Sequence, residues 1–274
     1  MPLVAVALLA QSISVSAAVA PRVEQFRYRF DNPSSFGTAA LVPHFFEQRY
    51  DAVPVWFSAE ARYRLGGSAA ATSAAISLRG RTHGSDIDTF FQPSGDVATS
   101  GTNGDVMLRS LELRQRIAVG ATRGWLWALT MGYRHDRADF LPDDRIVTHT
   151  TPPSVVRTFI TDRETAISQA MTFGVETTRE RALNDRWHVT IGAGVQPLVR
   201  GRLLVQLPDK YPGVDLIFTA LSAGATARVS VERRAHGWRA GVAVSGEGAW
   251  AYRPSSAYAL RGVSIAVFAG PGGR

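Results

Sequence analysis

The chain has 274 residues and a formal net charge of +7, and Lys210 is its one lysine, so its basic side chains are nearly all arginine. This length suits one large β domain or two small ones, and no Pro-, Ser- or charge-rich tract divides it. The absence of cysteine excludes disulfides and Cys-ligated metals, and no apolar run reaches the roughly 20 residues of a membrane-spanning helix.

Residues 1–20 resemble an export signal. An apolar run, Leu3–Ala10, leads into small residues, and cleavage after Ala17 or Ala20 fits the small-residue rule. No Lys or Arg precedes the apolar run, which departs from the usual pattern. We expect a signal peptide at 1–20 and a single domain at 21–274.

Ten segments with two-residue alternation follow, separated by Gly and Asp/Asn clusters that are typical of turns. Side chains on a strand alternate between two faces, so each segment separates apolar from polar residues. The predicted strands are Arg22–Phe30, Val53–Leu65, Ala71–Thr82, Val106–Val119, one beginning at Trp125, Thr165–Thr177, one beginning at Trp187, one ending at Val231, one beginning at Trp238, and Tyr258–Ala269.

Three tryptophans, Trp125, Trp187 and Trp238, each open such a segment directly after a tight polar turn. A soluble sheet has no need of an aromatic residue at the same end of every second strand. A membrane barrel does, because amphipathic rings settle at the headgroup level. We therefore predict a membrane girdle made of Trp125, Trp187, Trp238, Tyr133, Trp250 and Tyr252.

The connections predict the topology. Short turns at 66–68, 120–124, 179–186 and 233–237 alternate with longer loops at 31–52, 83–105, 135–164, 198–215 and 252–256. Bacterial barrels have short periplasmic turns, long extracellular loops and an even strand number. The sequence thus predicts an all-β, up-and-down antiparallel transmembrane β-barrel of ten strands in the outer membrane, with both termini periplasmic. Eight or twelve strands remain open, because 36–50 contains further possible strand residues.

The faces of the strands separate apolar from charged residues. In the first strand we expect Phe26, Tyr28 and Phe30 to face outward and Gln25, Arg27 and Arg29 inward; in the last, Val263, Ile265 and Val267 compete with Phe268 for the outward face. A soluble sandwich or lipocalin-like barrel would instead place the charged face in water. In a membrane barrel the charges form a luminal network, because unpaired buried charge is costly. The predicted network is Glu60, Arg62, Arg64, Arg79, Arg81, Glu112, Arg114, Arg116, Glu176, Arg228, Glu232, Arg239 and Glu247.

The architecture resembles the omptin proteases, ten-stranded barrels with a catalytic site at the outer mouth. The resemblance implies a pair of aspartates on the second extracellular loop, where this chain has Asp86 and Asp88, and an Asp-x-His on the fourth. The fourth loop here has Asp209, Lys210 and Asp215 without histidine. The catalytic motif is therefore incomplete.

His83-Gly84-Ser85 resembles the His-x-Ser of outer-membrane lipid hydrolases, in which histidine activates serine. By alternation with Arg79 and Arg81, we expect His83 and Ser85 to face the lumen or loop. Asp86 follows, where an asparagine would be closer to the deacylase pattern. These three residues can also be an ordinary strand end.

The leading functional hypothesis is a non-enzymatic outer-membrane barrel, with surface loops for binding or adhesion, or a narrow Arg/Glu-lined lumen for small solutes. The alternative is a barrel hydrolase that acts on lipid or peptide at the extracellular rim. The expected partners are outer-membrane lipid, lipopolysaccharide and an extracellular ligand or small solute. The scattered arginines argue against nucleic acid, and we expect neither a cofactor nor a metal.

Overall fold

In a computed structural model of the chain, residues 13–32, 44–78, 80–91, 95–159, 163–206, 208–209, 212–213, 215–251 and 256–271 are described. No helix within these ranges is long and apolar enough to cross a membrane. The strands are β1 (Ser14–Asn32), β2 (His44–Ala52), β3 (Val55–Leu65), β4 (Ser68–Ser77), β5 (Gly80–Phe91), β6 (Val97–Thr122), β7 (Trp125–Thr150), β8 (Pro153–Phe159), β9 (Glu164–Ala182), β10 (Trp187–Gln206), β11 (Asp215–Ala235), β12 (Trp238–Ala251) and β13 (Ser256–Pro271).

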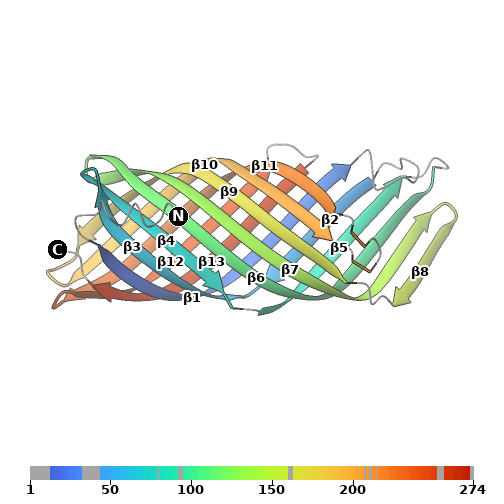
Figure 1. Cartoon of the computed structure of the whole chain (residues 1–274), viewed down its shortest axis with the longest axis horizontal. Coiled ribbons are helices and arrows are strands. Elements are labelled where there is room, and N and C mark those ends of the chain that lie inside the picture. Colours follow the sequence, from blue (N-terminus) through green and yellow to red (C-terminus); the bar gives the residue numbers. More distant parts are fainter. Residues whose placement is uncertain are drawn as a thin grey trace.

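These strands close into one antiparallel barrel (Figure 1), as the sequence predicts. The ring has 10 strand positions, because β2 and β3 follow one another along β1, β4 and β5 along β6, and β8 and β9 along β7. Pairing of β1 with β13 completes the ring. The predicted transmembrane β-barrel is thus confirmed at ten strands.

The two ends of the barrel differ. One end carries tight turns and the C-terminal end of β13, at the left of Figure 1, and the other carries the extended strands. In two of the turns, Arg123-Gly124 and His236-Gly237, both central residues have positive φ, between 51° and 80°. Turns of this kind match the twist of a two-residue hairpin. The strands that begin at Trp125, Trp187 and Trp238 are confirmed.

A broad belt of the outer surface near the turn end is apolar. Outward side chains such as Leu129, Val195, Val229 and Ile265 are each at least half exposed in the isolated chain. Their exposure has a physical reason in a bilayer, where hydrocarbon surrounds the belt. Val263, Ile265 and Val267 face outward, and Phe268 points into the lumen with 7% of its surface exposed.

The predicted extracellular loops are wrong in one respect, since most of their residues form strands. β2 lies within 31–52, β5 and β6 extend through much of 83–105, and the β7–β8 hairpin fills most of 135–164. β6 and β7 have 26 residues each, whereas about 9–11 suffice to cross a bilayer. The barrel wall therefore continues far beyond the apolar belt.

The predicted faces of the first strand are also wrong. Phe26 and Tyr28 point inward and are 1% and 2% exposed, whereas Gln25 and Arg27 are on the outer face. Arg27 there donates to Glu47 on β2 at 2.9 and 2.7 Å. This part of β1 lies beyond the apolar belt, where water surrounds the wall and apolar side chains are stable only inside.

β1 begins within the predicted signal segment. Its residues from Ser14 to Pro21 pair with Arg62–Val55 of β3, and Ala17–Val19 pair with Ala269–Val267 of β13. Residues 1–12 lie outside the described ranges. Cleavage after Ala17 or Ala20 stays a prediction, and it would remove part of the strand that closes the ring.

Candidate functional site: the barrel lumen

The lumen has two differently filled parts. Toward the extended end, inward side chains form a buried apolar core that includes Phe26, Tyr50, Phe140, Leu203 and Tyr258. The rings of Tyr28 and Tyr258 meet at a centroid distance of 5.5 Å. Toward the turn end, the inward side chains are charged, small or hydroxyl-bearing, and they leave space between them.

A layer of ion pairs, which we call the charged layer, separates these two parts. It consists of Arg22 and Glu24 on β1, Arg134 and Asp136 on β7, Glu112 on β6 and Glu247 on β12. Alternation on β1 places Arg22 and Glu24 directly before Phe26, so the layer lies immediately under the apolar core.

Arg134 is at the centre of the charged layer. Its Nη1 and Nη2 donate to the two carboxylate oxygens of Glu24 at 3.2 and 3.0 Å, and its Nε lies 3.0 Å from both oxygens of Asp136. The Arg134 guanidinium also lies over Phe26 and Trp56, 4.6 and 5.1 Å from the ring centroids. Bidentate bonding and cation–π contacts offset much of the cost of burying these charges.

Arg22 extends the layer across the barrel. Its Nε lies 2.6 Å from Glu24 Oε1, its Nη1 donates to Glu112 Oε2 at 3.3 Å, and it also contacts Glu247. The Arg22 guanidinium lies 5.2 Å from the Trp56 ring centroid. Strands on opposite sides of the barrel are thereby joined through one plane of charged and aromatic side chains.

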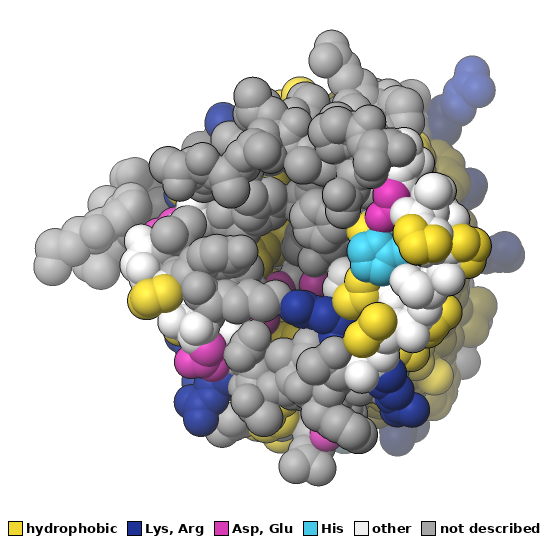
Figure 2. Space-filling model, turned by 90° about the vertical axis from the view of Figure 1, so that its right-hand side faces the viewer, with side chains coloured by type: hydrophobic (Ala, Val, Ile, Leu, Met, Phe, Trp, Pro, Cys, Tyr) yellow, Lys and Arg dark blue, Asp and Glu magenta, His cyan; other side chains and the backbone are white. Residues whose placement is uncertain are grey.

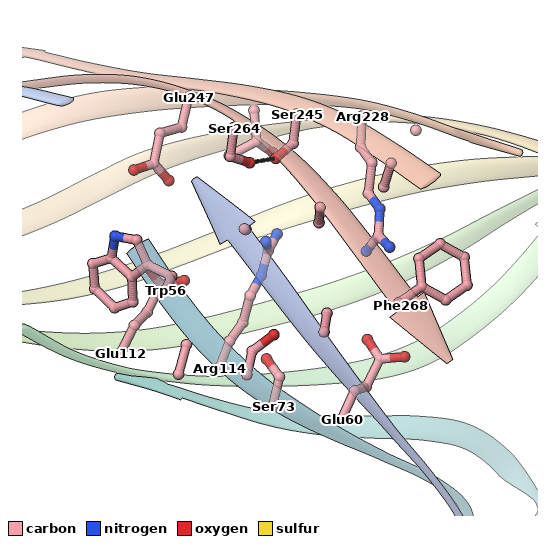
Figure 3. Close-up of a pocket in the computed structure, with 18 of the residues that line it drawn as sticks. Trp56, Glu60, Ser73, Glu112, Arg114, Arg228, Ser245, Glu247, Ser264 and Phe268 are labelled. Atoms are coloured by element: carbon pink, nitrogen blue, oxygen red, sulfur yellow. Dashed lines mark hydrogen bonds between the residues drawn. The ribbon is translucent and has the colours of Figure 1, made fainter. Parts of the chain in front are cut away.

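Below the charged layer lies a cavity of about 230 Å³, which we call the luminal cavity (Figure 3). A second space of about 400 Å³ shares Glu60, Arg62, Glu176 and Arg228 with it and reaches Gly124 at the turn end. The interior is therefore hollow from the charged layer down to the turns. Serine hydroxyls and alanine methyl groups form much of the remaining wall.

The structure brings most of the predicted luminal charges to these two spaces. Glu60 accepts from Arg62 Nε at 2.6 Å, and Arg114 Nη2 donates to Glu176 Oε2 at 2.9 Å. Arg116 Nη2 donates to the Thr178 hydroxyl at 2.6 Å. Those that line one or both spaces are Glu60, Arg62, Glu112, Arg114, Arg116, Glu176, Arg228, Glu232, Arg239 and Glu247.

The remaining predicted luminal residues are Arg64, Arg79 and Arg81. Arg64 is exposed beside the Gly66-Gly67 turn. Arg79 and the side chain of Arg81 fall outside the described residues. Arg239, which lines the luminal cavity, is 4% exposed, and its Nη2 donates to Ser16 Oγ at 2.9 Å.

The predicted girdle residues occupy the outer surface. Trp187, Trp238 and Trp250 are 43%, 62% and 55% exposed, whereas Trp125 is half-buried under the Arg179 guanidinium, 5.9 Å from its ring centroid. Tyr133 is half-buried too. Tyr252 is outside the described residues.

β5 divides the predicted rim residues between the two faces of the wall. A Cβ on Gly84 would meet Val106, Tyr50 and Phe140 of the apolar core, so Gly84 faces inward. His83 and Ser85, which were expected to face the lumen or loop, therefore lie on the outer face of β5 and not in the lumen. Asp86 faces inward, and the side chain of Asp88 falls outside the described residues.

Among the described residues of the fourth predicted loop, Asp209 and Asp215 each accept a hydrogen bond from a neighbouring segment. Asp209 accepts from the backbone N–H of Arg163 at 2.8 Å, and Asp215 accepts from Gln206 at 2.8 Å. The Asp209 carboxylate thus binds the backbone directly before β9, and the Asp215 carboxylate binds a side chain at the end of β10. Within the described ranges, no group of three or more His, Asp or Glu residues is arranged to hold a metal.

Sequence reasoning missed the charged layer apart from Glu112 and Glu247. Arg22, Glu24 and Arg134 lie in stretches that also contain outward arginines and aromatics, so alternation alone did not distinguish them. Trp56 was missed because it alternates with the outward Val55 and Phe57. An isolated tryptophan on the polar face of a strand is the signal that indicates it.

Among solved structures, the chain is similar to the outer membrane protease OmpT from Escherichia coli, with a TM-score of 0.61 and 8% identity over 95% of this chain and 96% of that one. It is less similar to the translocator domain of the autotransporter NalP from Neisseria meningitidis (TM-score 0.38, 13% identity, covering 98% and 92%). The COG4313 outer membrane channel from Pseudomonas putida F1 matches with a TM-score of 0.37 and 8% identity, over 94% of each chain.

No family model matches the sequence, and no curated protein does. At these identities the likeness concerns the fold, which is that of outer-membrane β-barrels.

Proposed function

We propose that this protein is a non-conducting, non-enzymatic outer-membrane barrel whose extended strands form an extracellular binding surface, with both termini in the periplasm. The observation that carries the proposal is the filling of the lumen. The charged layer and the apolar core above it occupy the interior over the extended half of the barrel.

The filling argues against passage of solutes. Glu24 has a fully buried side chain, and those of Arg134 and Asp136 are each 6% exposed. To open a path, these ion pairs and the tyrosines above them would have to separate. Breaking a buried pair costs about 3–5 kcal/mol, so spontaneous opening is rare.

The extended strands supply the surface for binding. Beyond the apolar belt the wall carries charged residues outside and an apolar core inside, as a soluble β-structure does. Figure 2 looks onto this end, where acidic and basic side chains lie around and within the opening. The β7–β8 hairpin projects furthest, and Asp96 fastens it by accepting from the backbone N–H groups of Thr150 and Thr151 at 2.9 Å each.

Exposed arginines border the apolar belt on its extended side. Arg200 and Arg202 alternate with the inward Val199, Gly201 and Leu203, so they face outward. Neither they nor the exposed Arg109 and Arg261 form a salt bridge within the described part of the chain. Guanidinium pairs well with phosphate, which supports lipopolysaccharide phosphates as the partner here.

Planar-bilayer conductance of the purified full chain tests the closed lumen. A conducting porin serves as the positive control, and heat-modifiable gel migration verifies that the inserted protein is folded. We expect no single-channel steps. Reproducible steps that disappear when the protein is left out would overturn the proposal.

The lipid partner is tested with lipopolysaccharide micelles. We expect Arg200→Gln together with Arg202→Gln to weaken binding and to reduce its salt dependence, because exposed charges are screened by salt. Arg123→Gln, at the exposed turn on the opposite end, is the matched control. If both variants bind as the unaltered chain does, the arginine border is not the lipid contact.

One observation favours a hydrolase at the outer wall as the second candidate. Strand pairing places Asp51 of β2 and Asp105 of β6 directly opposite His83, and all three are exposed. Ser85 lies two residues further on the same face, which is the residue set of a Ser-His-Asp hydrolase. Hydrolysis of a short-chain ester or phospholipid that is lost in Ser85→Ala would support this candidate, and activity unchanged in that variant would exclude Ser85.

A further inference from the structure

Among the described residues, Arg228 is the arginine of the luminal cavity that forms no salt bridge. Glu112 and Glu247 pair with Arg22, and Glu176 pairs with Arg114. Glu60 pairs with Arg62 and also lies 3.8 Å from Arg239 Nη2. Arg228 lines the same cavity, and within the described residues it has no hydrogen bond or salt bridge. Its charged neighbours include two arginines, Arg62 and Arg114, besides Glu60 and Glu176.

Two buried side chains of the cavity wall, Trp56 and Arg239, also have donors without acceptors among the described residues. Trp56 is 3% exposed and its Nε1–H has no hydrogen-bond partner among the described residues. Arg239 is 4% exposed, and its Nε and Nη1 have no hydrogen-bond acceptor there, although Nη1 lies 3.7 Å from Glu232 Oε2. A buried hydrogen-bond donor without an acceptor costs folding free energy, so the site favours a ligand with oxygen acceptors.

The side chains with these donors surround one space, so a single ligand can contact them. Figure 3 shows Arg114 and Arg228 reaching into the same space from two sides, with Trp56 at one end and Phe268 at the other. The Ser245 and Ser264 hydroxyls, 2.7 Å apart, face it as well. Alanines and Phe268 make the rest of the wall apolar.

We propose that the luminal cavity is a binding site for a small, singly charged oxyanion with an apolar body, such as an organic carboxylate. Arg228 supplies the uncompensated charge, and the alanines and Phe268 accept the apolar body. The ligand enters from the turn end of the barrel, because the second space continues from the luminal cavity to Gly124. The charged layer closes the cavity toward the extended end. This site is separate from the extracellular surface proposed above, and it needs no passage through the barrel.

The test is titration of the detergent-solubilised full chain with benzoate, followed by isothermal calorimetry. Benzamide, which has the same shape without the charge, is the ligand control. We expect saturable benzoate binding that Arg228→Gln weakens by at least about tenfold, the loss typical of a charge-assisted hydrogen bond. Arg64→Gln makes the same change of charge at an exposed arginine that lines neither space; it is the matched control and retains the affinity.

If Arg228→Gln fails the heat-modifiability check, Arg228→Lys replaces it in the test. This variant keeps the positive charge and loses only the planar, bidentate donor geometry of the guanidinium. It is expected to bind benzoate, more weakly than arginine does. Absence of saturable binding, equal binding of benzamide, or equal weakening by Arg228→Gln and Arg64→Gln would each overturn the proposal.

Discussion

Replacing Arg134 by alanine removes the centre of the charged layer. Two carboxylates, Glu24 and Asp136, then remain inside the barrel without the guanidinium that holds both. Arg22 still contacts Glu24, at 2.6 Å, so the uncompensated charge falls mainly on Asp136. Loss of one partner of a buried pair costs about 3–5 kcal/mol, and we expect Arg134→Ala to lower the free energy of unfolding by that amount.

The assay is urea unfolding of the refolded chain in detergent, followed by tryptophan fluorescence. Arg137→Ala, three residues further on β7, is the matched control. Arg137 pairs with Asp139 at 3.0 Å, but its side chain is 49% exposed, and exposed pairs contribute only about 0–1 kcal/mol. If Arg134→Ala and Arg137→Ala lower the stability equally and by less than about 1 kcal/mol, the reasoning about the charged layer is refuted.

Three further predictions concern the wall and its extensions. Gly84→Val should destabilise the barrel by about 1–3 kcal/mol in the same assay, because a Cβ there would lie 2.5 Å from Val106 Cγ2, and an unchanged midpoint would show that the core has room. Asp96→Asn should increase hydrogen exchange in β8 but not in β10. Hydrogen bonds from His149 and from the backbone N–H groups of Thr151 and Thr150 lower the Asp96 pKa from 3.8 to about 2. The stabilisation of the β7–β8 hairpin by the Asp96 carboxylate is therefore complete above pH 3.8 and is lost as the pH falls through about 2. A loss of exchange protection in β8 between pH 7 and 5 would contradict this. Deletion of residues 14–20 should abolish heat-modifiable folding, because β3 then keeps only the Pro21–Val55 pair of its pairing with β1. A fully folded deletion variant would show that the ring closes without these residues.

Alternation predicted the barrel well wherever the strands cross the apolar belt. At Leu129, Val229 and Ile265 the side chain that faces hydrocarbon must be apolar, so alternation assigns the outward residues of these strands. Tryptophans after turns predicted three strand starts correctly, because β7, β10 and β12 each begin at the tryptophan that follows the turn.

The same rule failed beyond the belt. At Phe26 and Tyr28 water replaces hydrocarbon outside the wall, and the apolar side chains turn inward. The sequence contains no mark of the height at which this inversion occurs. The loops were misassigned for a related reason, since strands such as β5 with His83-Gly84-Ser85 have neither clear alternation nor a long apolar run.

The charged layer could not be predicted because its members lie far apart in the chain. Glu24 and Arg134 are 110 residues apart, and their pairing depends on the register of a closed ring. Glu112 and Glu247 were predicted as luminal, but nothing in the sequence indicates that both share Arg22.

The most direct test of the account asks which side chains meet hydrocarbon. The chain has no cysteine, so single cysteines at Ile191 and Ile265, which are 40% and 53% exposed, can be labelled with a fluorophore in lipid vesicles and compared with cysteines at the neighbouring Thr190 and Ser264. We expect brominated lipid to quench the labels at Ile191 and Ile265, and a water-soluble quencher to quench those at Thr190 and Ser264. The opposite pattern would mean an oily interior inside a water-exposed wall, and it would contradict the membrane barrel.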